Sequence, residues 1–316
     1  MSLALPALAD IQAAHRRIAP FIHRTPAVTC RALDDLVGAE LVFKCENFQK
    51  VGAFKYRGAT NAVQSLDAAA AARGVATHSS GNHAQALALA ARTRGVAAYV
   101  VMPTNAPAVK RAAVAGYGAE IIPCEPTLQA REQTLARVVA ETGAEFVHPY
   151  DDPRVIAGQG TAVLELLEDA GPLDAVITPV GGGGLLGGTA IAAAAVAPGC
   201  RVYAAEPEGA DDAARSLAAG VLVPSVAPDT ICDGLLTSLS PRTFAAIQRH
   251  VTAIVTVSDA AVIEAMRLVF ERMKMVVEPS AVVGLAALMT RREQIVGQRV
   301  GVVFSGGNMD LGRLPF

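Results

Sequence analysis

A lysine between aromatic neighbours is the first candidate for covalent chemistry. Lys55 follows a glycine-flanked turn and opens a predicted helix, with Phe54 and Tyr56 on either side. An ammonium among apolar side chains loses hydration, so its pKa falls and the amine becomes a nucleophile. A lysine at a helix start can also extend past apolar neighbours into water. When this motif is considered by itself, that alternative stays open for Lys55. The chain has only five lysines: Lys44, Lys50, Lys55, Lys110 and Lys274.

A polar segment follows the expected strand at Gly74–Thr77. It contains Ser79, Ser80, Asn82 and His83 and leads into an expected helix. At such a position, free backbone N–H groups and short polar side chains converge on a ligand, which is often anionic. Helix capping alone would need only one of these residues. Binding and capping both remain open for this segment.

Four consecutive glycines, Gly181–Gly184, separate the expected strand Ala175–Pro179 from an uncharged helical stretch. Glycines let the backbone approach a phosphate closely, and the helix dipole favours the anion. With Gly187 they also satisfy GxGxxG, and Glu206 follows the next strand, as in a dinucleotide site. Close helix–strand packing is the alternative without a ligand.

Two further strand ends carry polar groups. The segment from Glu206 to Asp212 is rich in carboxylates, which suit Mg²⁺, Mn²⁺ or Ca²⁺, although acidic loops are often only solvated. The last expected strand opens into Ser305-Gly-Gly-Asn308, where Ser305 would face the same crevice.

Short β-branched runs alternate with Ala/Leu-rich helical stretches, which predicts βαβ units and mostly parallel sheets, an α/β fold. Strands are expected at Leu41–Cys45, Gly74–Thr77, Ala97–Met102, Glu120–Pro123, Glu145–His148, Ala175–Pro179, Arg201–Ala205, Ala253–Val257 and Arg299–Phe304. Helices are expected at Ala68–Ala72, Ala84–Arg94, Ala106–Gly116, Leu128–Thr142, Gly158–Ala170, Asp259–Lys274 and Ser280–Ile295.

Composition excludes several classes of protein. The 316 residues are 52% hydrophobic and 18% charged, which rules out intrinsic disorder, and the net charge of −2 comes without a basic patch for nucleic acid. Five dispersed cysteines suit a reducing, cytoplasmic setting. No signal peptide is recognised at the N-terminus, and the uncharged stretch Ala175–Cys200 contains Pro179 and glycines that a membrane helix tolerates poorly.

Together these motifs resemble the fold type II pyridoxal-phosphate enzymes, in the group of serine racemase, serine/threonine dehydratase and 3-hydroxyaspartate dehydratase. The matching motifs are Gly52-Ala-Phe-Lys55-x-Arg-Gly58, Ser79-Ser-Gly-Asn-His83, Gly158-Gln-Gly160, Gly181–Gly184, Glu206-Pro and Ser305-Gly-Gly-Asn308. The resemblance implies two domains, each with a mostly parallel, twisted sheet covered by helices. Residues 1–73 and 152–316 would form the large cofactor-binding domain, and residues 74–151 a small mobile domain that closes over substrate. It also implies a homodimer.

The resemblance implies roles for individual residues. Lys55 would hold pyridoxal 5'-phosphate as a Schiff base and then remove the substrate's α-proton. The other cofactor-binding residues would be Phe54, Asn82 at the ring hydroxyl, Gly181, Gly182, Gly183 and Gly184 at the phosphate, and Ser305 at the ring nitrogen. The substrate would meet Ser79, Ser80, Asn82, His83, Arg131 and Thr237. Mg²⁺, or Mn²⁺ or Ca²⁺, would bind Glu206, the Ala210 carbonyl and Asp212.

The activity that the resemblance implies is dehydration of a β-hydroxy amino acid to a 2-oxo acid and ammonia. The Gly-Ala-Phe-Lys form of the lysine motif favours 3-hydroxyaspartate slightly over serine or threonine. Racemisation of serine or aspartate, with Lys55 and Ser80 as bases on opposite faces, is the main alternative. A nucleotide-binding oxidoreductase built on the GxGxxG match is a second, but it leaves Lys55 without a role. No nucleic acid or membrane partner is expected.

The chain departs from the usual pattern of the group at three places. Ala53 stands where a serine is common, Cys232 replaces an alanine, and Thr237 replaces the serine of many racemases. The loss of the hydroxyl at Ala53 changes the hydrogen bonding expected next to the cofactor. The chain ends eight residues after Asn308, so the ligand-sensing C-terminal domain of biosynthetic threonine dehydratases is not expected, and a catabolic role is favoured.

Overall fold

Two separate sheets carry the fold in the computed structural model, which describes residues 4–290 and 298–316. The first has six strands in the order β1 (Ala27–Thr29), β2 (Glu40–Cys45), β10 (Arg299–Phe304), β7 (Ala175–Pro179), β8 (Arg201–Pro207) and β9 (Ala253–Val257). The second has four, in the order β5 (Glu120–Cys124), β4 (Ala98–Pro103), β3 (Val75–His78) and β6 (Glu145–Phe146). All pairings are parallel except β1 with β2. The expected α/β class is confirmed.

Helices connect these strands. The α-helices are α1 (Leu8–Ile18), α2 (Arg31–Val37), α3 (Lys55–Gln64), α4 (Ala68–Arg73), α5 (Asn82–Arg94), α6 (Ala108–Gly116), α7 (Leu128–Thr142), α8 (Pro153–Ala170), α9 (Gly184–Val196), α10 (Asp212–Ala219), α11 (Pro241–His250), α12 (Asp259–Leu268) and α13 (Val283–Thr290). Short helical turns include η1 (Glu46–Phe48), η2 (Lys50–Gly52), η3 (Glu208–Ala210), η4 (Asp233–Leu235), η6 (Pro279–Ala281) and η8 (Leu311–Arg313), and η5 (Val269–Met273) is a π-helix. None of the helices described is long and apolar enough to cross a membrane.

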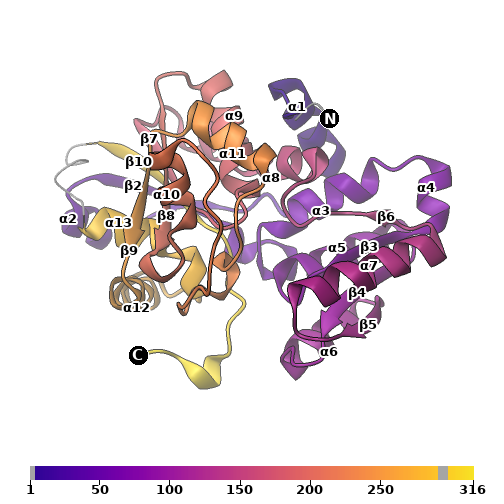
Figure 1. Cartoon of the computed structure of the whole chain (residues 1–316). Coiled ribbons are helices and arrows are strands. Elements are labelled where there is room, and N and C mark those ends of the chain that lie inside the picture. The colour runs from indigo at the N-terminus through magenta and orange to yellow at the C-terminus, as the bar shows by residue number, and fades with distance from the viewer. Residues whose placement is uncertain (1–3, 291–297) are drawn as a thin grey trace.

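The six-stranded sheet is covered on both faces. Alternate residues of β2 point to opposite sides, so Leu41 and Phe43 pack with α2, α12 and α13, whereas Val42 packs with α1, α8 and α9. Both faces are therefore apolar, which explains why the strands lack polar alternation. The four-stranded sheet is similar, with α7 on one face and α5 and α6 on the other. Figure 1 shows the two sheets in separate halves of the molecule, with α3 and α8 between them.

Most predicted elements are present, and their ends differ by a few residues. The helix expected at Asp259–Lys274 is present as α12 followed by the π-helix η5. It ends at Met273, because Lys274 has a left-handed φ of +60°. The helix expected at Ser280–Ile295 begins as η6 and α13, and its residues 291–295 lie outside the described part of the chain. The three-residue strand β1 was not expected.

Parallel register brings several strand ends to one edge of the six-stranded sheet. Cys45 at the end of β2 is level with Phe304 of β10, and Pro179 of β7 is level with Ala205 of β8. The loops that follow these strands therefore meet at the carboxyl edge, where open parallel sheets bind ligands. All four strands of the second sheet lie within residues 74–151, and the domain boundaries themselves stay a prediction.

Candidate active site

Lys55 lies at the start of α3, where two loops of the six-stranded sheet are joined. The backbone N–H of Phe54 donates to the carbonyl oxygen of Ser305 at 2.9 Å. Ala53 pairs with Gly306 in an isolated antiparallel bridge. The loop after β10 therefore holds the backbone that immediately precedes the lysine, and it brings Ser305 beside Phe54.

The environment of Lys55 favours a reactive amine. Its Nζ donates to the carbonyl oxygen of Pro149 at 2.9 Å and lies 5.1 Å from the ring centroid of Phe54. Burial lowers the pKa of Lys55 from 10.5 to about 8, against the opposing charge of Glu278. A substantial neutral fraction near physiological pH makes the amine suited to imine formation and to proton abstraction.

Asn82, the first residue of α5, links the two sheets. Its Nδ2 donates to both carboxylate oxygens of Glu278 at 3.0 and 3.1 Å, and its Oδ1 accepts from Nδ2 of Asn308 at 2.9 Å. Glu278 is buried and also accepts from the N–H of Asn308 at 3.1 Å, and burial raises its pKa to about 7. The sequence analysis missed Glu278, whose only signal was an acid after the apolar pair Val276-Val277.

The loop of four glycines lies between β7 and α9, at the carboxyl edge. A Cβ added to Gly182 would lie 2.3 Å from Cδ1 of Tyr150, so only glycine lets the Tyr150 ring pack there. A Cβ on Gly181 would lie 3.4 Å from Oγ1 of Thr237, which places Thr237 next to this loop. Because the first N–H groups of α9 have no partner within the helix, the loop fits the phosphate of a cofactor.

Apart from Thr237, the predicted substrate residues lie just after β3 or in the helices that cover the four-stranded sheet. Ser79 and Ser80 follow β3 and are half-buried, and Ser79 Oγ accepts from the N–H of Gly81 at 3.4 Å. Arg131 lies in α7, and its buried Nε has no hydrogen-bond partner in residues 4–290 and 298–316. An unpaired guanidinium N–H fits a carboxylate ligand.

His83 differs from what the sequence suggested. Its Nε2 lies 3.2 Å from the carbonyl oxygen of Val147, so Nε2 carries the hydrogen. Burial, with a smaller effect of Lys55, lowers the pKa of His83 to about 3, and the ring is neutral. The side chain therefore offers no charge to a substrate carboxylate, and its role as a substrate contact stays a prediction.

The predicted metal residues lie together at the end of β8 (Glu206) and just after it (Ala210 and Asp212). Glu206 accepts from the N–H groups of Ala213 and Ala214 at 3.3 and 2.6 Å. Asp212 Oδ2 is buried and has no partner in the described chain. Burial raises the pKa of Glu206 to about 8 and that of Asp212 to about 6. These carboxylates fit a cation together with the carbonyl of Ala210, although no group of three His, Cys, Asp or Glu side chains arranged for a metal is found among the described residues.

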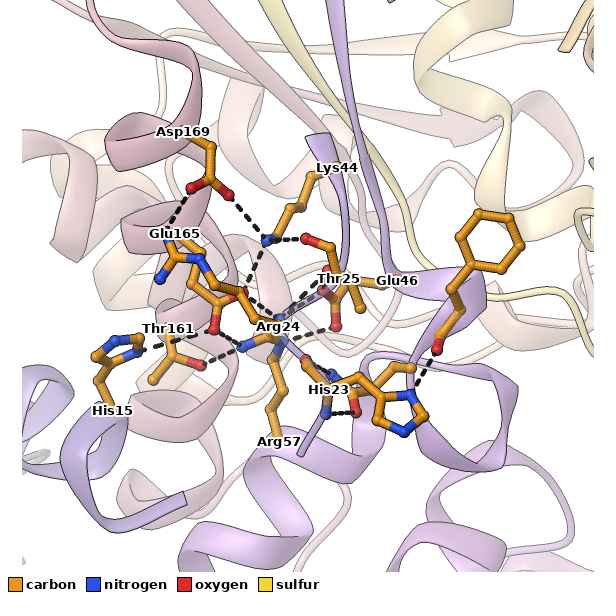
Figure 2. A network of polar contacts seen from close by, with 12 residues as sticks. His15, His23, Arg24, Thr25, Lys44, Glu46, Arg57, Thr161, Glu165 and Asp169 are labelled. Carbon is orange, nitrogen blue, oxygen red and sulfur yellow. Dashed lines mark hydrogen bonds and ion pairs between the residues drawn. The ribbon is translucent and has the colours of Figure 1, made fainter. Parts of the chain in front are cut away.

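A buried ionic cluster adjoins the lysine and was not expected. Arg57, Glu46, Glu165 and Lys44 are buried and bonded to one another through Arg57 and Glu165 (Figure 2). Lys44 is fully buried near the end of β2, because Glu165 and the carbonyl of Thr25 satisfy its ammonium.

Comparison with known proteins identifies relatives over nearly the whole chain. A β-hydroxyaspartate dehydratase of Paracoccus denitrificans is 53% identical over 312 residues, which are 99% of each chain. An L-threo-3-hydroxyaspartate ammonia-lyase of Saccharomyces cerevisiae is 48% identical over 98% of this chain and 95% of that one. The crystal structure of serine racemase from Dictyostelium discoideum has a TM-score of 0.94 and 48% identity, and the match covers 98% of this chain and 100% of that one.

The model of the family described as "Pyridoxal-phosphate dependent enzyme" matches residues 18–306, which include Lys55, the glycine loop and Ser305. This match confirms the family expected from the motifs and displaces the nucleotide-binding oxidoreductase. With the lysine, the glycine loop and the fold in agreement, the chain is an enzyme that belongs to the pyridoxal-phosphate dependent family.

Proposed function

We propose that this enzyme is a dehydratase of β-hydroxy amino acids, with 3-hydroxyaspartate preferred over serine and threonine. The observation that carries the proposal is the amine of Lys55, with its pKa lowered to about 8. It donates to the carbonyl of Pro149, and the ring of the next residue, Tyr150, packs on a glycine loop that fits a phosphate. The names of two relatives that are 53% and 48% identical support the substrate. The net reaction converts the amino acid to a 2-oxo acid and ammonia, since the water lost with the β-hydroxyl is taken up again on hydrolysis.

Residues around Lys55 would hold the cofactor and move the substrate's α-proton. Lys55 Nζ would hold the cofactor, and its free amine would take the proton from the substrate Cα. When bound, pyridoxal phosphate supplies the electron-withdrawing group that makes this proton acidic. The glycine loop would hold the phosphate, Asn82 would bind the ring hydroxyl, and Phe54 would pack beside the ring. Ser305, 3% exposed, would be a weak neutral partner of the ring nitrogen.

Substrate specificity is assigned to the segments around β3 and α7. Ser79, Ser80 and the N–H groups at the start of α5 would bind the α-carboxylate, as anions bind at helix N-termini. Arg131 would bind the second carboxylate of 3-hydroxyaspartate, because its buried Nε lacks a partner in the described chain. Thr237 would approach from the opposite side, next to the glycine loop.

Further properties complete the proposal. Mg²⁺ would bind Glu206, Asp212 and the Ala210 carbonyl, since both carboxylates are buried. Residues 74–151 would move as a unit and exclude water from the site on closing, against a large domain of residues 1–73 and 152–316. A homodimer in the cytoplasm is proposed from the family resemblance, and the five cysteines, all free, suit a reducing compartment.

The test is a product assay on the full chain loaded with pyridoxal phosphate. L-threo- and L-erythro-3-hydroxyaspartate, L-serine and L-threonine are each supplied with and without Mg²⁺, and 2-oxo acid and ammonia are measured. Equal amounts of both products are expected, with 3-hydroxyaspartate giving the highest kcat/KM. Lys55→Ala should lose both products and the absorption band of the lysine-bound cofactor, whereas Lys274→Ala should lose neither. Absence of 2-oxo acid from all four substrates would contradict the proposal.

Racemisation is a second candidate, because Ser80 is present and a serine racemase is 48% identical. A chiral assay on L-serine measures it directly. Ser80→Ala should abolish the appearance of D-serine and leave much of the elimination from the L-substrate, since Ser80 would return the proton to the opposite face. If both activities fall equally, Ser80 and Lys55 do not serve the two faces separately.

A further inference from the structure

Arg57 is the centre of a fully buried polar cluster next to the catalytic lysine (Figure 2). Its Nε and Nη2 donate to the two oxygens of Glu46 at 2.7 and 2.8 Å. Its Nη1 and Nη2 donate to the two oxygens of Glu165 at 2.8 and 2.7 Å, and Nη1 also donates to Thr161 Oγ1 at 3.1 Å. The guanidinium is therefore held by two bidentate carboxylates, the strongest geometry available to it.

The cluster is electrically balanced. Lys44 Nζ donates to Glu165 Oε2 at 2.7 Å, so two cations face two carboxylates. Burial alone would raise the pKa of Glu165, but the hydrogen bonds and charges of Arg57 and Lys44 outweigh it and hold that pKa below its usual value. We call Arg57, Glu46, Glu165 and Lys44 the Arg57 cluster.

The cluster joins three elements at one point. Arg57 lies in the first turn of α3, Glu46 directly follows β2, and Glu165 is in α8. Next to it, the helices α3 and α8 touch through their backbones, because a Cβ on Gly158 would lie 2.6 Å from Cα of Gly58. The first turn of α3 is thus held by Glu46 after β2 and by α8, in addition to the loop after β10.

Stability alone gives no reason for this arrangement. Desolvating four charges costs several kcal/mol per ion, and well-packed apolar residues in place of a buried ion pair are often neutral or stabilising. A forked guanidinium does, however, specify one orientation between its partners, which apolar contacts do not. Arg57 lies two residues from Lys55, and side chains at i and i+2 of a helix do not face each other. Its effect on Lys55 must therefore pass through the backbone.

We propose that the Arg57 cluster is a positioning element that fixes the first turn of α3 and so sets where the amine of Lys55 lies. The groups whose charges act on or beside Lys55 are Glu278, His83 and His148, and none of them belongs to the cluster. The inference rests on the proposed role of Lys55, but the amine can be observed without any reaction of substrate.

Arg57→Lys tests the proposal, because it keeps the positive charge and removes the planar guanidinium that donates to both carboxylates. The full chain, freed of cofactor so that the Lys55 amine is not tied up in the imine, is treated with an amine-acylating reagent at a series of pH values. The extent of modification of each lysine is read by peptide mass spectrometry. In the parent, Lys55 should be half-protonated near pH 8. In Arg57→Lys this midpoint should shift upward by about one pH unit, because the amine becomes better hydrated. The kcat for substrate should fall roughly 10- to 100-fold, with a smaller change in KM.

A matched control separates positioning from general loss of stability. Leu285→Ala removes a fully buried side chain of α13 on the far face of the six-stranded sheet and so lowers the stability of the fold. Its Lys55 midpoint should equal that of the parent. A folded Arg57→Lys chain with an unchanged midpoint would overturn the proposal, and so would an equal shift in Leu285→Ala.

A second variant covers the case in which Arg57→Lys does not fold. Thr161→Val removes one acceptor of Arg57 and should shift the Lys55 midpoint in the same direction by a smaller amount. An unchanged midpoint in that variant would also overturn the proposal. If the parent releases no 2-oxo acid, the proposed function fails, but the acylation profiles still decide whether the cluster positions the amine.

Discussion

Lys110 Nζ lies 2.6 Å from Oδ2 of Asp233, and this ion pair joins the two halves of the molecule. Lys110 belongs to α6, which covers the four-stranded sheet, whereas Asp233 begins η4, close to the glycine loop. Like the bonds from Asn82 to Glu278 and from Lys55 to Pro149, it is a polar contact between the halves that would open and close around a substrate.

Asp233→Asn should weaken the contact between the two halves of the molecule. Both side chains are partly exposed, so the pair is worth about 0–1 kcal/mol, and KM should rise at most about fivefold with kcat nearly unchanged. The difference should shrink as salt is added, because salt screens exposed charges. Arg137→Ala is the control, since it breaks an exposed ion pair within α7 alone. Equal KM values for Asp233→Asn and the parent at low salt would show that the pair does not contribute to closure.

Glu278→Gln should change the pH dependence of stability. Burial raises the pKa of Glu278 from 4.5 to about 7, so the folded protein binds its proton more tightly than the unfolded chain does. The resulting stabilisation is present below pH 4.5 and is lost as the pH rises through 7, a change of about 3 kcal/mol. Denaturant unfolding from pH 4.5 to 8 should therefore show a flatter profile for Glu278→Gln than for the parent.

Glu278→Gln should lower the pKa of Lys55, whereas Arg57→Lys should raise it. The charge of Glu278 raises the pKa of Lys55, so its removal should move the acylation midpoint of Lys55 below the parent's value near 8. Glu264→Gln, an exposed change in α12, should alter neither profile. A midpoint that stays at the parent's value would mean that Glu278 is already neutral where Lys55 titrates.

The parts of the site that sequence reasoning found are local. Lys55 and the four glycines each stand in a short motif between a strand and a helix, and parallel strands bring such loops to one edge. Glu278 and the Arg57 cluster were missed because their partners are far apart in the chain. Asn82 is 196 residues from Glu278, and Arg57 is 108 residues from Glu165. The sequence alone does not distinguish a buried acidic residue from a solvated one, because the residues that bury it come from distant parts of the chain.

Gly182→Ala should damage the phosphate loop through a steric clash. The new Cβ would lie 2.3 Å from Cδ1 of Tyr150, so the ring or the loop must move, at a cost of about 1–3 kcal/mol. Affinity for pyridoxal phosphate, measured by absorbance titration, should fall at least roughly tenfold, because the displaced N–H groups are the proposed phosphate donors. Gly199→Ala is the matched control, since nothing lies within 4 Å of a Cβ there.

The double variant Gly182→Ala with Tyr150→Ala distinguishes the clash from a need for glycine itself. Removing the ring should recover part of the lost free energy of unfolding, because the obstacle to the new methyl group is gone. If the double variant is as unstable as the sum of the two single ones, the Tyr150 contact is not the cause of the damage.

Glu206→Gln should remove the response of the enzyme to divalent cations. Glu206 and Asp212 are buried carboxylates, and Asp212 Oδ2 has no partner in the described chain, so a bound cation would relieve an unfavourable arrangement. A cation that binds only the folded chain stabilises it by about 2.7 kcal/mol at a hundredfold excess over Kd. Thermal unfolding of the parent should therefore shift upward on addition of Mg²⁺, Mn²⁺ or Ca²⁺, and that of Glu206→Gln should not. Glu208→Gln, an exposed change two residues away, should keep the full shift. An unshifted parent with all three cations, or an equal shift in Glu206→Gln, would remove Glu206 from any metal site.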